Sequence, residues 1–191
     1  MKIGIVPSIK ETYPNQFEFK IDVKLVKFLQ TVFKKADINI LCNTKFKKIN
    51  FLCLSGGNDL TIFKNNKSNI LRSKIDNFYY QKCKKKNIPI LGICYGAQFI
   101  AFKEKARLKK KRHLGYHDIF FVENNKKKYV NSYHNYIITK LPKSVKSIAV
   151  AKDKSIECFH LKQKKILGII WHPEREKMFK KGDIQLIKKY S

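Results

Sequence analysis

The chain has 191 residues, 43% of them hydrophobic, and a formal net charge of +28. This length and apolar content suffice to bury one core, so we predict a single domain over residues 1–191. No apolar run approaches the roughly 20 residues of a membrane span, and the five cysteines include no Cys-x-x-Cys pair. We therefore expect a cytoplasmic protein with no membrane partner, no disulfide framework and no zinc site.

The first half of the chain alternates strand and helix signals. Its opening apolar residues are typical of a first strand rather than a signal peptide, because no apolar segment with a small-residue cleavage site follows. Apolar residues then recur at strand or helix spacing. The predicted elements are a strand at 2–6, a helix near 22–35, strands at 38–42 and 50–54, a helix near 68–86, and a strand at 88–93 followed by a helix.

The second half changes to short, closely spaced strand signals. They lie near 117–122, 128–132, 146–151 and 156–161, before a strand at 166–171 and a short helix at 183–190. The whole order predicts an α/β fold, with a mostly parallel central sheet flanked by helices and a small hairpin-rich antiparallel region.

Cys94 stands between two glycines, where the strand at 88–93 gives way to a helix. Gly92 and Gly96 would let the strand and helix approach without a Cβ clash, so the central side chain would project from a sharp turn. A cysteine beside a helix N-terminus favours the thiolate form. A free cysteine among apolar residues is also a common core residue, so the motif alone leaves both interpretations open.

His172 and Glu174 follow another buried strand signal, with Pro173 between them. Catalytic groups in α/β folds collect at the carboxyl ends of strands, so we expect His172 and Cys94 to lie at the same edge of the sheet. Glu174 would then accept from one imidazole nitrogen while the other faces Cys94. The sequence thus predicts a Cys94, His172, Glu174 triad; the alternative is a buried histidine next to a surface glutamate.

Paired glycines, Gly56 and Gly57, follow the strand at 50–54. Such a turn can point backbone N–H groups outward, as a developing oxyanion requires. We expect the amides of Gly57 and Tyr95 to form a two-donor oxyanion hole.

These motifs together resemble a class I glutamine amidotransferase domain, and within that superfamily the γ-glutamyl hydrolases of the γ-glutamyl-γ-aminobutyrate hydrolase (peptidase C26) type. The matching segments are 55–59, 92–98, 130–135 and 171–174, in the family's order. The short length also resembles a compact branch that cleaves a nucleotide-linked γ-glutamyl phosphoramidate. The resemblance implies a flavodoxin-like fold, a γ-glutamyl thioester on Cys94 and no metal or organic cofactor. It further implies that the glutamyl group is held by Gly56, Gln98, Ser132, Tyr133 and His134.

The sequence departs from the hydrolase pattern at several places. Ser55 stands where the hydrolase branch often has proline, and Tyr136 stands where it often has glutamine. The loops around Asp59 are also short. The glutamyl half of the site is therefore predicted with more support than the pocket for the leaving amine.

The resulting prediction is a cysteine-dependent hydrolase of a γ-glutamyl amide with a small-molecule substrate. If that substrate is the nucleotide-linked phosphoramidate, it is anionic. One alternative is a glutaminase subunit that passes ammonia to a synthetase partner. Another is a basic nucleic-acid-binding protein on an inactive amidotransferase scaffold. Lysine supplies nearly all the positive charge, whereas planar recognition of phosphate or bases favours arginine. This indicates compositional bias, so we expect no nucleic-acid partner. His113 and His117 lie four residues apart, and Gly115 between them argues against a helical metal pair.

Overall fold

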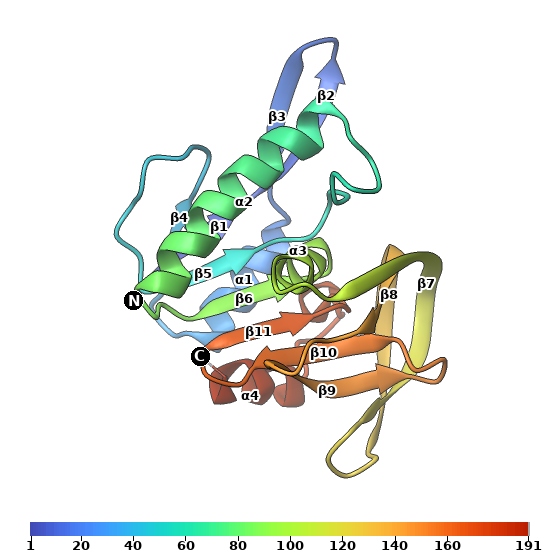
Figure 1. The fold of residues 1–191 in the computed structure, drawn as a ribbon. Helices are drawn as coiled ribbons and strands as arrows, with labels where there is room; N and C mark the ends of the chain where they lie inside the picture. The colour runs from blue at the N-terminus through green and yellow to red at the C-terminus, as the bar shows by residue number, and fades with distance from the viewer. Residues whose placement is uncertain (191) are drawn as a thin grey trace.

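Residues 1–190, described by a computed structural model, form a nine-stranded sheet with helices on both faces, and a separate two-stranded hairpin (Figure 1). The strands of the large sheet are β1 (Lys2–Val6), β4 (Asp37–Ile40), β5 (Phe51–Leu54), β6 (Ile90–Ile93), β7 (Arg107–Phe121), β8 (Lys127–Lys140), β9 (Val145–Ala151), β10 (Ile156–Leu161) and β11 (Ile166–Ile169). The helices are α1 (Val23–Val32), α2 (Lys67–Lys85), α3 (Tyr95–Lys103) and α4 (Lys181–Lys189), with a 3-10 turn η1 (Pro173–Arg175). The hairpin consists of β2 (Ser8–Tyr13) and β3 (Gln16–Lys20).

The sheet order is β4-β1-β5-β6-β11-β10-β8-β7-β9, and its first five strands are parallel. Successive side chains of these strands point to opposite faces. Phe51 and Cys53 of β5 pack with α1 and α4, whereas Leu52 and Leu54 pack with α2 and α3. Because both faces are covered, these strands are short continuous apolar runs, which is why the sequence signal located them well.

The expectation of a mostly parallel sheet was wrong. Among residues 1–190, the large sheet has four parallel strand pairings and five antiparallel ones. β10, β8, β7 and β9 follow one another, and β9 pairs again with β10, so these four strands close into an antiparallel ring. We name this closed set of strands the antiparallel ring. The lysine-rich segment 107–116 hid the first ten residues of β7, so the sequence underestimated this region.

Other differences are smaller. The segment 8–20, for which the sequence predicted no strand, forms the β2–β3 hairpin, which extends beyond the sheet in Figure 1. β8 has 14 residues, where the sequence predicted a strand over 128–132. No helix within residues 1–190 is both long and apolar enough to cross a membrane.

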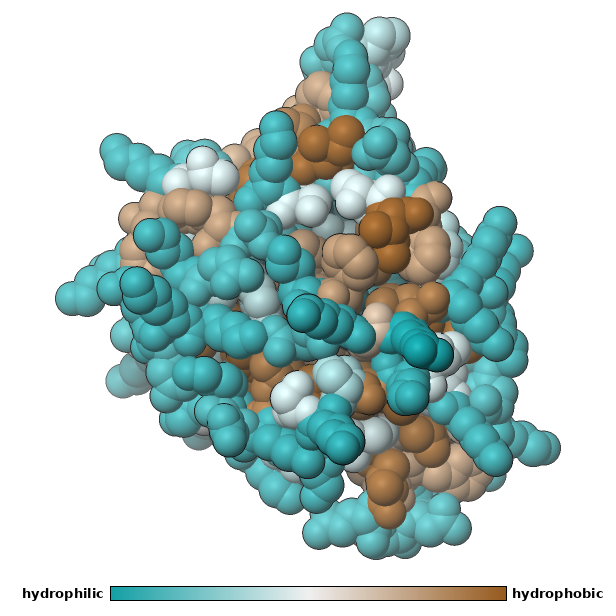
Figure 2. All heavy atoms as spheres, in the orientation of Figure 1, coloured by the Kyte–Doolittle hydropathy of each residue, from teal (hydrophilic) through white to brown (hydrophobic). Residues whose placement is uncertain are grey.

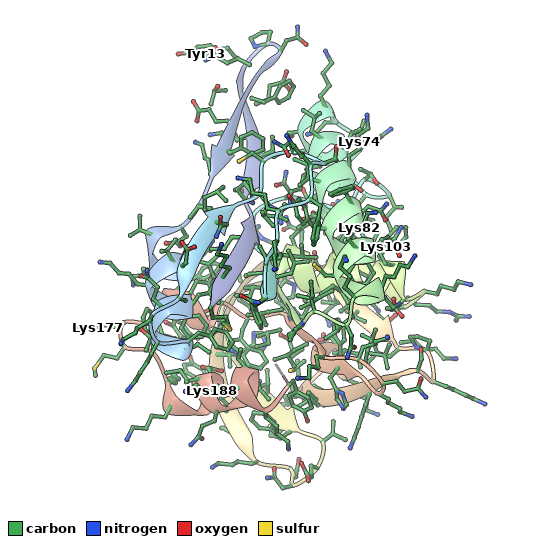
Figure 3. All side chains as sticks on the ribbon, turned by 90° about the vertical axis from the view of Figure 1, so that its left-hand side faces the viewer. Tyr13, Lys74, Lys82, Lys103, Lys177 and Lys188 are labelled. Atoms are coloured by element: carbon green, nitrogen blue, oxygen red, sulfur yellow. The ribbon has the colours of Figure 1, made fainter. Side chains whose placement is uncertain are left out.

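The positive charge is distributed widely over the surface. Most residues on the face in Figure 2 are hydrophilic, and the hydrophobic ones form small separate groups. The lysines labelled in Figure 3 come from different elements and point outward on different sides: Lys74 and Lys82 from α2, Lys103 from α3, Lys177 from the segment before α4, and Lys188 from α4. The labelled lysines therefore do not gather on one side of the molecule.

Candidate active site

Three adjacent parallel strands, β5, β6 and β11, end at one edge of the sheet. Gly56 follows β5, Cys94 follows β6 and His172 follows β11. The backbone N–H of Cys94 donates to the carbonyl of Ile169 at 2.8 Å, which ties the start of α3 to the end of β11. The topology therefore brings together residues separated by up to 116 positions in the chain, as expected for the carboxyl edge of an open α/β sheet.

The backbone at Cys94 adopts a conformation that is uncommon for a residue with a Cβ, with φ +52° and ψ −108°. The flanking glycines permit it. A Cβ on Gly92 would lie 2.6 Å from the carbonyl carbon of Gly96, and a Cβ on Gly96 would lie 2.0 Å from the carbonyl oxygen of Leu54. Both contacts are with backbone, so neither could be relieved by a side-chain rotation. Glycine at both positions is thus a steric requirement of this turn.

His172 lies between Cys94 and Glu174. Its Nδ1 is 2.6 Å from Oε1 of Glu174, and both side chains are buried. A Cβ on Gly56 would lie 2.9 Å from Cε1 of His172 and 3.3 Å from Cβ of Cys94, so both side chains pack against this glycine. Because a carboxylate can only accept, Nδ1 carries a proton, and Nε2 is the nitrogen available to Cys94.

The electrostatics of this group favour a protonated imidazole. Burial lowers the pKa of His172, but the neighbouring Cys94 sulfur and the Glu174 carboxylate outweigh burial and raise it to about 9. In contrast, burial raises the pKa of the Cys53, Cys83 and Cys158 thiols. Those three cysteines are therefore poor nucleophiles at neutral pH.

Asn131 on β8 fixes the backbone of His172. Its Oδ1 accepts from the His172 N–H at 2.9 Å, and its Nδ2 donates to the His172 carbonyl at 2.9 Å and to Oε1 of Glu176 at 3.1 Å. The sequence motif contained Asn131, but we assigned it no role in the site. Its amide links the antiparallel ring to the histidine segment.

Arg72 of α2 is fully buried beneath the glycine turn, and sequence reasoning missed it entirely. It donates to the carbonyl of Pro7 at 2.6 Å, to the carbonyl of Ser55 at 2.9 Å and to Oδ2 of Asp76 at 2.8 Å. The ring of Tyr95 lies 5.0 Å from its guanidinium carbon. A single cation thus holds two strand ends and the first residue of α3 in place. The sequence offers one indication of this buried pair, which is that Asp76 follows Arg72 by four residues on a predicted helix. Most pairs with this spacing are solvent-exposed, so the indication is weak.

Cys94 and His172 open into a cavity of about 300 Å³ that Gly57, Gln98, Tyr133 and His134 also line. Gly57 has φ +104°, a conformation that suits glycine. These six residues are the part of the predicted site that the structure brings to one cavity.

Gln98 has a second role, and Tyr95 and Ser132 do not direct their side chains into the cavity. Nε2 of Gln98 donates to the carbonyl of Tyr136 at 2.8 Å, so its amide group also braces β8. The side chain of Tyr95 is buried away from the cavity, but its N–H is among the first of α3, which have no partner within the helix. Ser132 is fully buried and is not among the residues that line the cavity.

Asp59 and Arg175 give the cavity groups of both charges, and the sequence had assigned neither of them a role in the site. Arg175 Nε lies 3.8 Å from Glu174, and its guanidinium carbon lies 5.5 Å from the ring of Tyr133. The arrangement as a whole offers a thiol, an imidazole held by a carboxylate, and backbone amides at the start of α3 that have no partner within the helix. Such a set is suited to nucleophilic attack on a carbonyl group.

The chain belongs to the class-I glutamine amidotransferases: the family model "Glutamine amidotransferase class-I" matches residues 16–188. Among curated proteins, it is 38% identical over 144 residues to the γ-glutamyl-CDP-amidate hydrolase of Campylobacter jejuni, an alignment that covers 74% of this chain and 70% of that protein. It is also 32% identical over 99 residues to the GMP synthase (glutamine-hydrolyzing) of Phocaeicola vulgatus, covering 45% of this chain. That match spans only 19% of the GMP synthase.

Solved structures show the same fold. A protein from Thermoplasma acidophilum that is described as one part of a GMP synthase superposes with a TM-score of 0.73 at 20% identity, covering 100% of this chain and 92% of that one. A glutamine amidotransferase from Thermotoga maritima gives a TM-score of 0.69 at 16% identity, covering 98% and 82%. At these identities the comparison supports the fold alone.

Proposed function

We propose that the protein is a cysteine-dependent hydrolase that cleaves a γ-glutamyl amide bond and releases glutamate and an amine. The observation that carries this proposal is the Cys94 thiol on a strained turn, next to an imidazole whose other nitrogen is 2.6 Å from the Glu174 carboxylate. The similarity to the Campylobacter jejuni hydrolase supports the substrate class. Asp59 and Arg175, which offer one negative and one positive group to the cavity, suit the α-amino and α-carboxylate groups of a glutamyl residue.

The mechanism has two halves. The Cys94 thiolate attacks the γ-carbonyl carbon, and the N–H groups of Gly57 and Tyr95 stabilise the oxyanion. The C–N bond breaks, the protonated His172 gives its proton to the leaving amine, and a γ-glutamyl thioester remains on Cys94. A water molecule then gives a proton to His172 and attacks the thioester; its collapse releases glutamate and returns the thiolate and protonated histidine. Every proton stays between His172, the amine and water, so the proposal needs no cofactor.

For the leaving group, we propose a nucleotide-linked phosphoramidate, because the 38% identical relative is a γ-glutamyl-CDP-amidate hydrolase. Such a substrate is anionic, and a net charge of +28 would speed its arrival without selecting it. We further propose that residues 1–191 act as one domain. The unpaired cysteines fit the reducing cytoplasm that the sequence predicts.

The test is glutamate release from a panel that contains γ-glutamyl-CDP-amidate, γ-glutamyl-γ-aminobutyrate and glutamine. We expect hydrolysis of at least one γ-glutamyl amide, with loss of more than about 10³-fold in kcat for Cys94→Ala. Cys42→Ala is the matched control, because Cys42 lies outside the cavity and is only half-buried. Full activity in Cys94→Ala, or equal losses in both variants, would contradict the proposal.

A glutaminase subunit is the second candidate, because the chain also resembles the glutamine-hydrolyzing GMP synthases over part of its length. In that case, glutamine would be the best substrate and a synthetase partner would raise its turnover strongly. A high kcat/KM on another γ-glutamyl amide without any added partner would exclude this alternative.

A further inference from the structure

Three histidines and one glutamate of the antiparallel ring converge on one another, and His134 alone among them also lines the Cys94 cavity. Glu157 comes from β10, His134 from β8, and His113 and His117 from β7. Oε1 of Glu157 lies 3.5 Å from Nδ1 of His113, 3.6 Å from Nε2 of His117 and 3.9 Å from Nε2 of His134. The expectation that His113 and His117 could not form a metal pair assumed helical spacing. On a strand, residues four apart share a face.

Burial makes this cluster unusual. The side chain of Glu157 is fully buried, and that of His134 is 2% exposed. Within residues 1–190, both carboxylate oxygens of Glu157 and the three inward ring nitrogens have no hydrogen bond of acceptable geometry. Buried polar atoms are nearly always satisfied by a partner, and a buried carboxylate in particular is paired or binds a metal.

The outer nitrogens of two histidines decide which way their lone pairs point. Nδ1 of His134 is 3.0 Å from the carbonyl of Tyr136, which can only accept, so Nδ1 carries the hydrogen. Nε2 of His113 is 3.1 Å from the carboxylate of Asp153, so there Nε2 carries the hydrogen. In the neutral rings, the inward nitrogens therefore present lone pairs to Glu157, which is itself an acceptor. Only a cation or an additional proton can lie favourably among them.

The distances to Glu157 are close to those of a tetrahedral metal site. With metal–nitrogen and metal–oxygen distances of about 2.0–2.2 Å, the ligand atoms of a tetrahedral site lie about 3.4 Å apart. The three distances to Glu157 exceed this value by only a few tenths of an ångström. The ligand atoms of His113, His134 and Glu157 all lie within 4.8 Å of one another. His117 is outside this group, so its ring must move toward the ion to complete four ligands. Imidazole and carboxylate donors suit zinc and its first-row neighbours rather than magnesium or calcium.

We propose that His113, His117, His134 and Glu157 bind one zinc-type divalent cation. Hydrogen bonds from the ligands to Asp153 and to the carbonyl of Tyr136 orient the two rings, as is usual for metal-bound histidines. Four protein ligands define a structural site. The ion would join β7, β8 and β10, and it would hold His134, which also lines the Cys94 cavity, in one position. A surface cavity of about 570 Å³, which His113, His117 and Asp153 line, gives the ion a route from solvent.

The first test is metal binding by the full chain, purified without an affinity tag that binds metals and treated with a chelator. Titration with ZnCl2 should show one tight equivalent and raise the thermal unfolding temperature as zinc increases. Titration with CoCl2 should give the intense visible bands of a four-coordinate ion without a sulfur-to-cobalt charge-transfer band. Cys94→Ala should bind identically, so this result does not depend on the proposed hydrolase. No tight equivalent, or a sulfur charge-transfer band, would overturn the proposal.

The second test uses variants. Glu157→Gln should abolish the tight equivalent, and Asp153→Asn should weaken zinc affinity by about 10–100-fold. His117→Asn changes a side chain that is 24% exposed, so it should fold even if Glu157→Gln does not, and it should also lose the four-coordinate cobalt spectrum. His160→Gln is the matched control, because His160 is on β10 but its ring packs against that of Tyr190, with ring centroids 4.6 Å apart. Wild-type zinc affinity in His117→Asn would refute the site.

Discussion

Arg72 offers the sharpest test of how the fold holds the glycine turn. The side chains of Arg72 and Asp76 are both fully buried and 2.8 Å apart. Arg72→Met keeps a long apolar stem but removes the charge, so Asp76 is left buried without its cation. Breaking a buried pair in this way costs about 3–5 kcal/mol. The carbonyls of Pro7 and Ser55 also lose their donors, which adds about 1 kcal/mol each.

The double variant Arg72→Met/Asp76→Leu separates stability from function. It removes both charges, so only the carbonyl cost of about 2 kcal/mol should remain, and the protein should regain most of its stability. The turn at Gly56 and Gly57 would still lack the cation that fixes the Ser55 carbonyl. Because a displaced oxyanion donor costs about 10²-fold or more, we expect kcat to stay low in the double variant.

The assay combines urea unfolding with glutamate release. Trp171 is the single tryptophan of the chain and is buried, so its fluorescence reports unfolding of the site region. Arg107→Met is the control, because Arg107 is exposed on β7 and its loss should change stability by less than about 0.5 kcal/mol. If Arg72→Met unfolded at the same urea concentration as the wild type, the buried pair would not stabilise the fold. If the double variant recovered full kcat, Arg72 would have no positioning role.

Three further outcomes follow from the geometry. The kcat/KM for hydrolysis should fall as the pH rises through about 9, where His172 loses its proton. Glu174→Gln removes a charge that raises the pKa of His172, so this alkaline fall should move to lower pH. A fall at the same pH in both proteins would contradict the assignment. Gly96→Ala should prevent folding or lower the free energy of unfolding by more than about 3 kcal/mol, because its Cβ would meet a backbone oxygen. Gly182→Ala on α4 is the control, because nothing lies within 4 Å of its Cβ. In thermal denaturation it should be neutral or stabilising by up to about 1 kcal/mol. Asn131→Ala should lower kcat by about 10-fold or more with a smaller change in KM, since it frees the backbone of His172; equal kcat values would show that η1 alone holds the histidine.

The sequence predicted the parallel half of the sheet well, because strands buried on both faces are apolar throughout. It failed for β7, whose segment 107–116 presents lysines and arginine to solvent on one side of the antiparallel ring. A half-exposed strand carries an apolar residue only at every second position, and here two of the half-buried positions are His113 and Gly115. The hydrophobic signal was therefore too weak to predict the strand's start or the closure of the ring.

For the candidate site, local motifs predicted the turn at Cys94 and the contact between His172 and Glu174, which are two residues apart. They could not predict the supports. Asn131 bonds a backbone 41 residues away, and Arg72 bonds one 65 residues away. In both cases a side chain satisfies backbone groups, and such a contact depends on where the strands end in space. No periodicity along the chain reports it.

The two halves of the sheet contribute different parts of the proposed chemistry. The parallel half supplies the groups that react: the Cys94 turn, the amides of α3 and the Gly57 loop. The antiparallel ring supplies Tyr133 and His134 on the cavity wall and Asn131 behind His172. Changes at Tyr133 and His134 on β8 should therefore act on KM, while the attack on the γ-carbonyl should depend on β5, β6 and β11. If an ion holds His134 in place, its removal should raise KM for the γ-glutamyl amide more than it lowers kcat, because Cys94 keeps its own supports.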